Sequence, residues 1–388
     1  MVPVMLVVGL GIGAYILIYF NLIRGRQCRS DASLKGKTVI VTGANVGIGK
    51  MTALDMAKRG ARVILACRVK ETGEAAAYDI RKLSGNNQVV FMKLDLASLE
   101  SVRSFCRAFL SSEPRLDILI NNAGLSGFGK TAEGYNIVFG VNHLGHFLLT
   151  SLLLDRLKQS TPSRIVVLAS YAHEWGKIDF NKISVPSEHV KDTLQSYCDS
   201  KLCNVLFARE LANRLQGTSV TCYSVHPGTV HTNLARSLPS WIKVLIEPVS
   251  WLFLRTPMNG AQTSIYCAVQ EGIEMYSGRY FDNCQVRQVC VWQVGEATDI
   301  AEDCGYRSTR RSGGLKDFNQ VPLKTPEQNL LLGLNRQKKS CCFYLHIWRF
   351  IPECLWRVGT IFHVTIENRH VWSPLVLVEK TVQLLNMR

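Results

Sequence analysis

The sequence lacks the residue patterns of several common protein classes. No two of its 13 cysteines form a Cys-x-x-Cys pair, and an odd number of cysteines cannot all be joined within one chain. Free thiols in a reducing compartment therefore suit the chain better than a disulfide framework. We find no zinc-finger spacing, no RNA-binding signature and no internal repeat, and the histidines do not have the spacing of metal ligands. These absences argue against a disulfide-rich domain, a metal centre and a repeat array.

Acidic residues are few relative to basic ones, 30 against 45, which gives a formal net charge of +15. A basic protein can bind nucleic acid, an anionic membrane surface or a phosphate-bearing ligand. The excess is uneven, because residues 305–388 carry 13 Lys or Arg and only 5 Asp or Glu. Without a nucleic-acid-binding motif, we expect no nucleic-acid partner, and we favour the membrane and phosphate interpretations.

The beginning of the chain lacks charge. Val2 to Phe20 are apolar residues and glycines, close to the ~20 residues that a membrane-spanning helix needs. Arg24, Arg26 and Arg29 follow this run and no basic residue precedes it, so the positive-inside rule places the downstream domain in the cytosol. A cleaved signal peptide, followed by secretion, is the alternative, although it would normally begin with a charge and have a shorter apolar core. We therefore expect residues 1–22 to be a transmembrane anchor.

From Gly36 onward, short apolar runs alternate with helical patterns. The expected strands are residues 38–42, 62–66, 88–94, 116–121, 163–169 and 219–225, and the expected helices are residues 47–59, 71–83, 99–110, 134–158 and 194–215. Continuous apolar strands separated by helices predict a parallel sheet that is covered on both faces, the Rossmann-type doubly wound α/β architecture. Residues 36–286 form this single predicted domain, and residues 287–388 form an atypical basic tail of unknown structure.

An apolar segment, residues 232–257, follows the last expected strand and contains few charges. Three interpretations are open. It can be a lid over an apolar substrate, a helix packed on the core, or a contact with the bilayer.

A glycine-rich turn, Thr-Gly-Ala-Asn-Val-Gly-Ile-Gly at residues 42–49, follows the first strand and opens the first helix. Gly43 permits the tight turn, Gly47 lets the backbone approach a pyrophosphate, and Gly49 permits close packing of helix on strand. The unpaired N–H groups at the helix amino terminus would then face the phosphate charge. In this strand–turn–helix setting, the motif predicts a dinucleotide site rather than a purely structural turn.

The ends of the next three strands carry polar residues that suit a dinucleotide. An NAD site would place an acidic residue after the second strand, but Arg68 stands there. Its guanidinium can hold a 2′-phosphate, which favours NADP(H) over NAD(H), unless Arg68 is only a solvated charge. Asp95 could accept a hydrogen bond from the adenine amino group, or it could cap the next turn. Asn121–Gly124 would bring the backbone close to the cofactor ribose, although asparagine turns are common.

Tyr197 and Lys201 are four residues apart on an expected helix and so share one face. A nearby ammonium favours the phenolate and would lower the tyrosine pKa toward working pH. Hydride transfer to a carbonyl needs a proton at the oxygen, which Tyr197 can supply, and Ser170 at the end of the fifth strand can hydrogen-bond the same oxygen. Asn142 lies in the middle of another helix. The Tyr-x-x-x-Lys pair is common by chance, and its order after the glycine turn, Asn121 and Ser170 makes it specific.

This ordered set resembles the short-chain dehydrogenase/reductase superfamily and, within it, the retinol dehydrogenase branch. The resemblance is carried by residues 41–50, 59–68, 121–124, 141–150, 197–211, 226–230 and 260–263. It implies an NADP(H)-dependent oxidoreductase on an intracellular membrane such as the endoplasmic reticulum. Such an enzyme transfers a hydride between nicotinamide and an apolar alcohol, aldehyde or ketone: a retinoid, a steroid or a lipid aldehyde. A non-catalytic, membrane-bound binder of cofactor or lipid is the alternative function, and homo-oligomerisation is left open.

The resemblance also implies a role for each site residue. Tyr197 would be the catalytic acid/base, Lys201 would bind the nicotinamide ribose and tune Tyr197, Ser170 would orient the carbonyl, and Asn142 would hold a water in the proton relay. The implied cofactor ligands are Gly43, Asn45, Gly47, Ile48 and Gly49 for the pyrophosphate, Arg68 for the 2′-phosphate, Asp95 for adenine, Asn121 for the adjacent ribose, and Pro227, Gly228, Val230 and Thr232 for the carboxamide. Three features depart from the family pattern: Val46 stands where Ser or Thr is usual, the interval from Ser170 to Tyr197 is slightly longer than in close relatives, and the closing helix of the family is missing after Arg287.

Overall fold

The computed structural model describes residues 13, 15–17, 19–179, 182, 184–230, 254–289 and 381. The predicted anchor lies mostly outside the described residues. Nearly all of the apolar segment at 232–257, Thr232 included, and nearly all of the basic tail also lie outside them.

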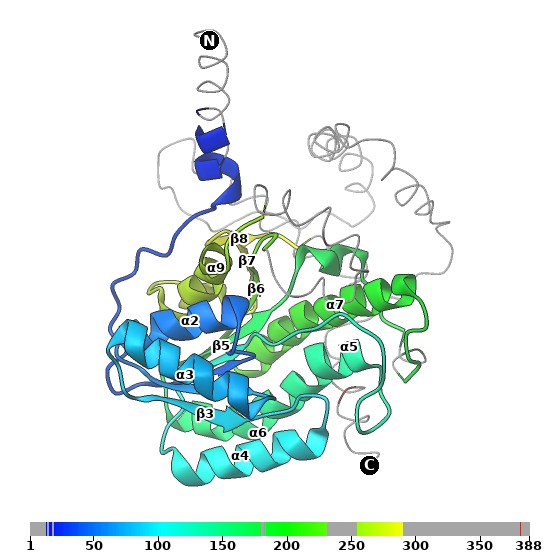
Figure 1. Cartoon of the computed structure of the whole chain (residues 1–388), viewed down its shortest axis with the longest axis horizontal. Helices are drawn as coiled ribbons and strands as arrows, with labels where there is room; N and C mark the ends of the chain where they lie inside the picture. Colours follow the sequence, from blue (N-terminus) through cyan, green and yellow to red (C-terminus); the bar gives the residue numbers. More distant parts are fainter. Residues whose placement is uncertain are drawn as a thin grey trace, which may run out of the picture. The chain divides into compact units, whose positions relative to one another are not determined.

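An eight-stranded sheet forms the centre of the domain, in the order β3-β2-β1-β4-β5-β6-β7-β8 (Figure 1). The strands are β1 Thr38–Thr42, β2 Arg62–Cys67, β3 Val89–Lys93, β4 Ile118–Asn121, β5 Ser163–Leu168, β6 Val220–His226, β7 Tyr280–Asp282 and β8 Gln285–Arg287. Every neighbouring pair is parallel except β7 and β8. The predicted doubly wound fold is confirmed, and β7 and β8 are short additions that the sequence patterns did not indicate.

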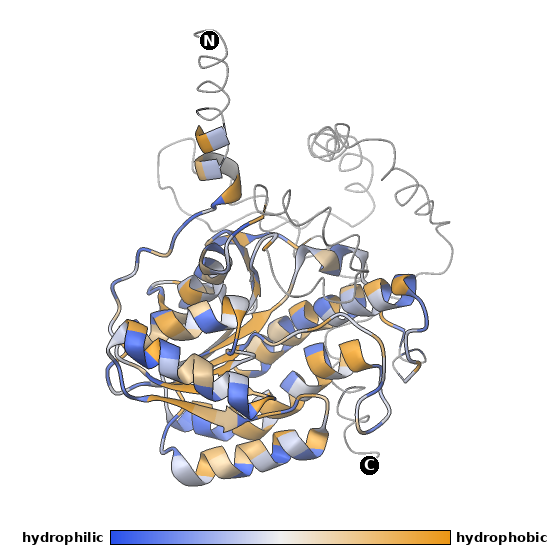
Figure 2. Cartoon of the chain, viewed as in Figure 1, coloured by the Kyte–Doolittle hydropathy of each residue, from blue (hydrophilic) through white to orange (hydrophobic). Residues whose placement is uncertain are grey.

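Helices cover both faces of the sheet (Figure 1). The helices α2 (Gly47–Lys58), α3 (Lys70–Ser84) and α9 (Pro257–Val269) pack together on one face, and α4 (Leu99–Ser112), α6 (Gly145–Gln159) and α7 (Val190–Arg214) cover the other. Helix α9 was not among the expected helices. Because the central strands β1 and β4 are buried at every position, they are mainly apolar rather than alternating (Figure 2).

Successive strand residues supply two separate cores. In β1, Ile40 packs among the residues of α4, α6 and α7, whereas Val39 and Val41 pack on the α2 and α9 side. All three side chains are fully buried. This follows from the two-residue period of a strand, which sends neighbouring side chains to opposite faces.

The single helix expected over residues 134–158 is wrong in two respects. The helical stretch begins at Ile137, because the Asn136 side chain accepts hydrogen bonds from the Val138 and Phe139 amides and ends the loop there. It then contains a π-helical turn, Gly140–Leu144, before α6 begins. A Cβ on Gly140 would lie 2.2 Å from the Thr131 side chain, so the tight contact at this turn requires glycine.

One helical stretch of the described residues, Ile137–Gln159, is long and apolar enough to cross a membrane. It is 78% buried within the domain, in the layer of α4 and α7. Its hydropathy is therefore that of a core helix.

The described cysteines are free, and no disulfide joins any two of them. Six are buried, five of them in separate helices and strands and Cys284 in the turn between β7 and β8: Cys67, Cys106, Cys203, Cys222, Cys267 and Cys284. Burial raises the pKa of the Cys67 thiol to about 11 and that of Cys106 to about 12. At neutral pH these thiols are protonated and act as small apolar side chains.

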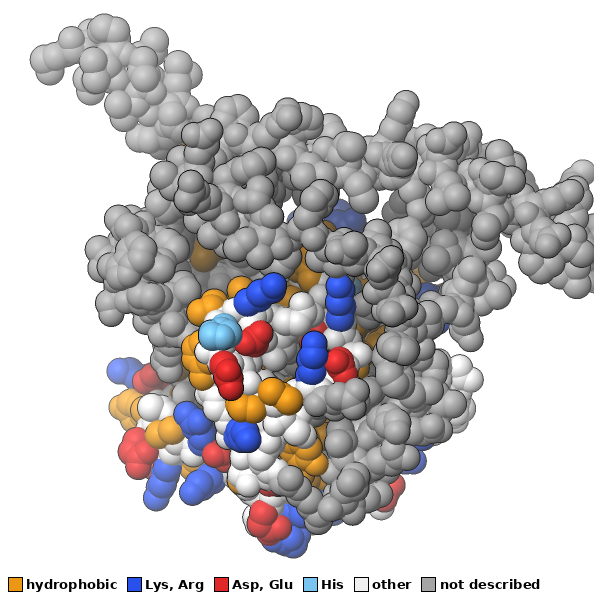
Figure 3. Space-filling view, turned by 90° about the vertical axis from the view of Figure 1, so that its right-hand side faces the viewer, with side chains coloured by type: hydrophobic (Ala, Val, Ile, Leu, Met, Phe, Trp, Pro, Cys, Tyr) orange, Lys and Arg blue, Asp and Glu red, His pale blue; other side chains and the backbone are white. Residues whose placement is uncertain are grey.

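Acidic and basic side chains are interspersed on the part of the surface described in Figure 3, whereas Asp117, at the amino end of β4, is the least exposed of the described carboxylates. Asp117 accepts a hydrogen bond from the Thr38 amide at 2.8 Å, pairs with Lys37 at 2.9 Å and accepts two hydrogen bonds from the Nε and Nη2 of Arg115. Burial opposes its charge, yet the hydrogen bonds from Arg115, Thr38 and Lys37 prevail and lower the pKa of Asp117. Asp117 thus fixes the start of β1 beside β4.

We expect Asp117→Ala to destabilise the fold by about 1.5–3 kcal/mol at pH 7, the range for hydrogen bonds to a charged group. Asp117→Asn should cost less, because its amide oxygen can still accept from Thr38. The folded pKa is lowered, so the contribution of Asp117 is complete above the unfolded pKa and is lost as pH falls through the folded pKa. Urea unfolding should show wild type and variants converging in acid, and a difference independent of pH would contradict this account.

Candidate active site

The predicted site residues that the structure describes gather at one edge of the sheet. Parallel strands place their carboxyl ends together, so the loops after β1, β2, β3, β4, β5 and β6 meet at this edge, which we call the carboxyl edge. Helix α7 brings Tyr197 and Lys201 to the same edge, and the π-helical turn brings Asn142.

The glycine turn after β1 has the predicted conformation. Gly43 and Gly47 have positive φ angles of 63° and 59°, which glycine adopts readily. A Cβ on Gly47 would meet nothing within 4 Å, so the space beside it is open, whereas a Cβ on Gly49 would lie 2.5 Å from the Gly43 carbonyl oxygen. Val46 provides no side-chain cap, so the first amides of α2 are not satisfied by a side chain at the N-cap. An open cradle with free amides fits a pyrophosphate.

Three other predicted cofactor residues lie beside this turn. Ile48 follows Gly47 in the first turn of α2 and packs partly against the core. Asn45 donates a hydrogen bond to the Thr72 hydroxyl at 3.2 Å, which ties the turn to α3. Arg68 directly follows β2, is exposed, and forms no ion pair with the described residues.

Asp95 caps the turn before α4, which is the structural alternative for this residue. Its Oδ1 accepts from the Ala97 amide at 3.0 Å, and its own amide donates to the Ser101 hydroxyl at 3.0 Å. Asp95 remains half-buried at the end of β3, so capping does not remove it from the carboxyl edge.

Asn121 is directed into the domain, where its amide donates to the Thr150 hydroxyl of α6 at 2.8 Å. Its Oδ1 is buried without a partner among the described residues. The Asn121 side chain thus fixes the end of β4, and the next two residues, Asn122 and Ala123, lie against Gly49 and Gly43 of the cradle. A Cβ on Gly124 would lie 3.6 Å from the Lys201 Nζ, so this loop lies directly against the Lys201 ammonium.

The hydroxyl of Thr42, which the sequence analysis did not single out, organises the loop after β4. It accepts hydrogen bonds from the Asn122 and Ala123 amides, both at 2.9 Å, and lies 2.8 Å from His146 Nε2. His146 Nδ1 faces the Asn142 carbonyl at 3.3 Å, so Nδ1 carries the proton and Nε2 accepts from Thr42. Burial lowers the pKa of His146 to about 3 and keeps the ring neutral.

Asn142 is completely buried, and the π-helical turn directs its side chain toward the site. Its Oδ1 accepts from the Leu125 amide at 2.8 Å, and its Nδ2 donates to the Leu125 carbonyl and to the Ser200 hydroxyl. Ser200 in turn donates to the Tyr197 carbonyl at 2.8 Å. Asn142 therefore joins the loop after β4 to the helix that carries Tyr197.

Lys201 is 3% exposed, and its Nζ donates to the Leu168 carbonyl at the end of β5 at 3.1 Å. Burial lowers the pKa of Lys201 to about 8. Asn204, one turn further along α7, donates to the same carbonyl and to the Asn142 carbonyl, both at 3.0 Å. Asn204 and Ser200 were missed, although both lie on the Tyr197 face of α7 at helical spacing.

The Tyr197 hydroxyl shares a hydrogen bond with Ser170, and its pKa moves in the opposite direction from the predicted one. Burial raises the pKa of Tyr197 to about 12, and the Ser170 hydrogen bond only partly offsets this effect. The Lys201 ammonium lies 5.5 Å from the centre of the Tyr197 ring, over its face, and is hydrogen-bonded to Leu168 instead of the phenol oxygen. Burial therefore outweighs the nearby positive charge that the helical spacing predicted.

The segment after β6 is held by Arg255, another residue that the sequence analysis missed. Val230 forms a bridge with Arg255, whose guanidinium donates to the Pro227 carbonyl at 3.4 Å. Gly228 has a φ of 83°, and a Cβ there would lie 2.5 Å from the guanidinium. The predicted carboxamide segment thus has a fixed backbone next to the end of β6.

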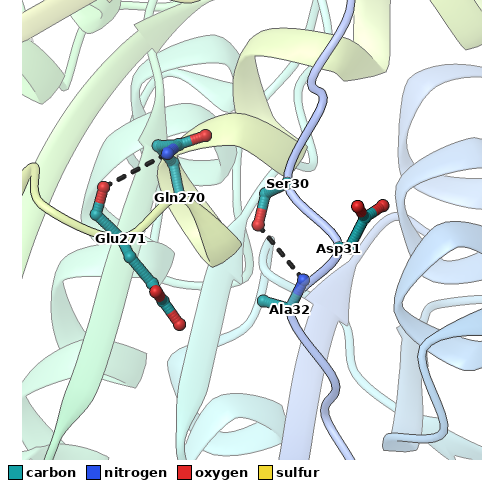
Figure 4. A pocket seen from close by; sticks show the side chains of 5 residues that line it. All are labelled: Ser30, Asp31, Ala32, Gln270 and Glu271. Atoms are coloured by element: carbon teal, nitrogen blue, oxygen red, sulfur yellow. Dashed lines mark hydrogen bonds between the residues drawn. The ribbon is translucent and has the colours of Figure 1, made fainter.

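A pocket of about 360 Å³ lies elsewhere in the domain, where the chain before β1 passes the end of α9 (Figure 4). Its lining residues are Ser30, Asp31, Ala32, Gln270 and Glu271. None of the predicted site residues lines it, and its two carboxylates would repel a phosphate. Within the described parts of the chain, no group of His, Cys, Asp and Glu could hold a metal ion.

Comparison with known proteins matches residues 37–243 to the short chain dehydrogenase family model. The chain is 59% identical over 290 residues to dehydrogenase/reductase SDR family member 13 of Bos taurus, covering 74% of this chain and 77% of that protein. The sequence motifs of this chain also resemble those of that protein. The chain is also 52% identical to mouse retinol dehydrogenase 11 and 51% identical to human retinol dehydrogenase 12. These matches cover 68% and 67% of this chain and 82% of each relative.

Solved structures agree with the fold. A crystal structure of an uncharacterised protein from Mycobacterium paratuberculosis matches with a TM-score of 0.54 and 32% identity, over 73% of this chain and 94% of that one. An oxidoreductase from E. coli matches with a TM-score of 0.54 and 25% identity, over 66% and 98% of the two chains.

Burial of the charged Lys201 ammonium should lower the free energy of unfolding of the protein. We expect Lys201→Met to stabilise the cofactor-free protein by about 2–3 kcal/mol at pH 7, since its pKa falls from an ordinary 10.5 to about 8. The Leu168 carbonyl keeps its hydrogen bond from Asn204 in the variant. The penalty is complete below the folded pKa and vanishes above the unfolded one, so the gain should fade between pH 8 and 10.5. Denaturant unfolding at pH 7 and pH 10 measures it, and a destabilised variant at pH 7 would refute it.

Proposed function

The chain belongs to the short-chain dehydrogenase family, and we propose that it is a membrane-anchored reductase that uses NADPH to reduce apolar aldehydes or ketones, retinoids among them. Its oxidoreductase class follows from the family, whose fold binds a nicotinamide cofactor. One observation carries the catalytic part of the proposal: Ser170, Tyr197, Lys201 and Asn142 belong to one connected polar cluster at the carboxyl edge.

When bound, the nicotinamide supplies or accepts the hydride. The Tyr197 hydroxyl would give its proton to the carbonyl oxygen of the substrate as that oxygen gains charge. Ser170 would hold the same oxygen, because its side chain already hydrogen-bonds with Tyr197. Since burial raises the pKa of Tyr197 to about 12, the phenol is neutral at pH 7, which supports its use as a proton donor in reduction rather than as a base in alcohol oxidation.

Lys201 would keep a positive charge next to Tyr197 and stabilise the tyrosinate as the proton leaves. Its pKa of about 8 leaves it mostly charged at pH 7 and also able to give up a proton. Asn142 and Ser200 hold the backbone of α7 at Tyr197, so they would keep the phenol in place. We assign Asn142 the further role of binding a relay water.

We assign the pyrophosphate to the cradle of Gly43, Asn45, Gly47, Ile48 and Gly49, adenine to Asp95 and the adjacent ribose to the loop after Asn121. The carboxamide segment would be Pro227, Gly228 and Val230, together with Thr232. The preference for NADP(H) rests on Arg68, an exposed guanidinium without an ion-pair partner among the described residues, at the strand end where a 2′-phosphate would lie.

The substrate class rests on the relatives, because those more than 50% identical include retinol dehydrogenases 11 and 12. The uncharged run from Val2 to Phe20 supports a membrane anchor within residues 1–22, with the domain at 36–286 in the cytosol and a separate tail at 287–388. Both features suit an apolar substrate that is dissolved in a membrane.

We expect Tyr197→Phe to lower kcat for NADPH-dependent reduction of retinal at least 100-fold, because the variant lacks the proton donor. Its affinity for NADPH, measured by fluorescence titration, should change little, since the ring that packs near Lys201 remains. Cofactor binding without turnover by wild type against a panel of retinoid, steroid and lipid carbonyls would instead favour the non-catalytic binder. Full activity of the variant would contradict the assigned role.

We expect Arg68→Leu to raise the KM for NADPH by about 10- to 100-fold, the loss of charge-assisted hydrogen bonds to one phosphate. The KM for NADH should stay within about twofold, because NADH lacks this phosphate. Lys70→Leu is the matched control, since Lys70 lies two residues away and already faces Glu74 at 3.9 Å. Equal changes in both KM values would argue against a 2′-phosphate site at Arg68.

A further inference from the structure

The chain that enters the domain is fixed along its whole length. We call residues 23–34, which precede β1, the strap. At its start, the Arg255 guanidinium donates to the Ile23 carbonyl at 2.9 Å, and the Arg26 amide donates to Asn283 Oδ1 at 2.8 Å. Asn283 directly follows β7, so the strap begins at the carboxyl edge, next to the segment of Pro227 that Arg255 also holds.

The strap then follows α9 to the opposite edge of the sheet. The Cys28 amide donates to Gln262 in the middle of α9 at 2.9 Å, and the Ser30 hydroxyl reaches the carbonyl of Val269, the last residue of α9, at 3.3 Å. Arg59 at the end of α2 donates to the Ser30 carbonyl at 2.7 Å. Because these hydrogen bonds fix the strap to the domain, the residues just before Ile23 extend from the carboxyl edge without a free linker.

The residues just before the strap expose apolar side chains. Ile16, Leu17 and Phe20 are 47%, 65% and 55% exposed, and the Arg24 guanidinium lies 5.3 Å from the centre of the Phe20 ring. Apolar side chains followed directly by arginine match the boundary between hydrocarbon and headgroups in a bilayer.

A second exposed apolar feature lies on the same edge. Tyr171 and Trp175, in the short 3-10 helix that follows Ser170, are 50% and 60% exposed and stack edge to face at 5.3 Å. The Tyr171 amide donates a hydrogen bond to His226 Nδ1 at the end of β6. In the parallel register of β6 and β7, His226 lies beside Asp282. The aromatic pair and the start of the strap therefore lie at the ends of neighbouring strands.

The opposite edge carries charges of both signs. Asp31 and Glu271 line the pocket there (Figure 4), whereas Glu274 is paired with Arg164 at 2.5 Å and Asp117 with Lys37 at 2.9 Å. At the carboxyl edge, Arg24 and the exposed Arg26 at the start of the strap would attract anionic headgroups.

We propose that the carboxyl edge at β5 to β7 rests on the membrane surface, with Tyr171 and Trp175 in the headgroup layer. Tyrosine and tryptophan favour this layer because their rings are apolar and their polar atoms remain hydrated. An apolar carbonyl compound would then reach Ser170 and Tyr197 directly from the bilayer. The proposal rests on the proposed anchor and names the surface through which its substrate arrives.

The test uses the full-length protein in vesicles of phosphatidylcholine and phosphatidylserine that contain a photoactivatable lipid. Mass spectrometry after irradiation should find labelled peptides that contain Tyr171 and Trp175. Peptides with Met275 and Tyr276 are the internal control, because these residues are 80% and 39% exposed but precede β7, at the opposite edge. Equal labelling of both edges, or labelling of the Met275 peptide alone, would overturn the proposal. It would also be overturned if Tyr171 and Trp175 stayed unlabelled because another protein covers them.

A double variant, Tyr171→Ser with Trp175→Ser, tests the consequence for the substrate. The KM for a membrane-dissolved aldehyde should rise about tenfold, while the KM for a short, water-soluble aldehyde should not change, because the variant weakens only the contact with lipid. Met275→Ser with Tyr276→Ser is the matched control and should change neither. Equal effects on both substrates would overturn the proposal. The labelling needs no turnover, so a failure of the proposed enzymatic function remains distinguishable from a failure of this orientation.

Discussion

The Leu168 carbonyl, at the end of β5, is the acceptor on which the geometry of the site depends. It accepts from Lys201 Nζ at 3.1 Å and from Asn204 Nδ2 at 3.0 Å, so two successive turns of α7 are fixed to one strand end. Asn204 also holds the Asn142 carbonyl, and Asn142 holds Ser200. A one-residue shift of α7 would turn Tyr197 away by roughly 100°. The strand, the helix and the π-helical turn therefore form a single unit around the reacting group.

Much of the fold could be predicted from the sequence, because strands buried on both faces are apolar throughout and glycine turns have few conformations. The six expected strands exist, and their ends differ from the expected ones by at most two residues. The π-helical turn could not be predicted, because the close contact at Gly140 is made with Thr131, which lies outside the turn in the preceding loop. The short strands β7 and β8 have too few residues to show a period. The positions of Tyr197 and Lys201 followed from spacing, whereas the roles of Thr42, Asn204 and Arg255 depend on contacts between distant segments.

Burial explains the difference between the expected and the observed electrostatics. Sequence spacing predicts which charges lie near each other, but it does not predict how far water is excluded from them. Burial raises the pKa of Tyr197 and lowers that of Lys201, so each group is driven toward its neutral form. The same burial keeps His146 neutral, which allows it to accept from Thr42 and support the loop after β4. One physical effect thus sets both the reactive groups and their support.

The buried thiols give the domain its own set of reporters. Cys67 in β2, Cys106 in α4, Cys222 in β6 and Cys267 in α9 are unreactive in the folded state, because burial both covers them and raises their pKa. An alkylating reagent can reach each one only when its own element opens. The order in which these thiols are alkylated under native conditions would therefore rank the local stabilities of the two helical layers and the sheet, without any added label.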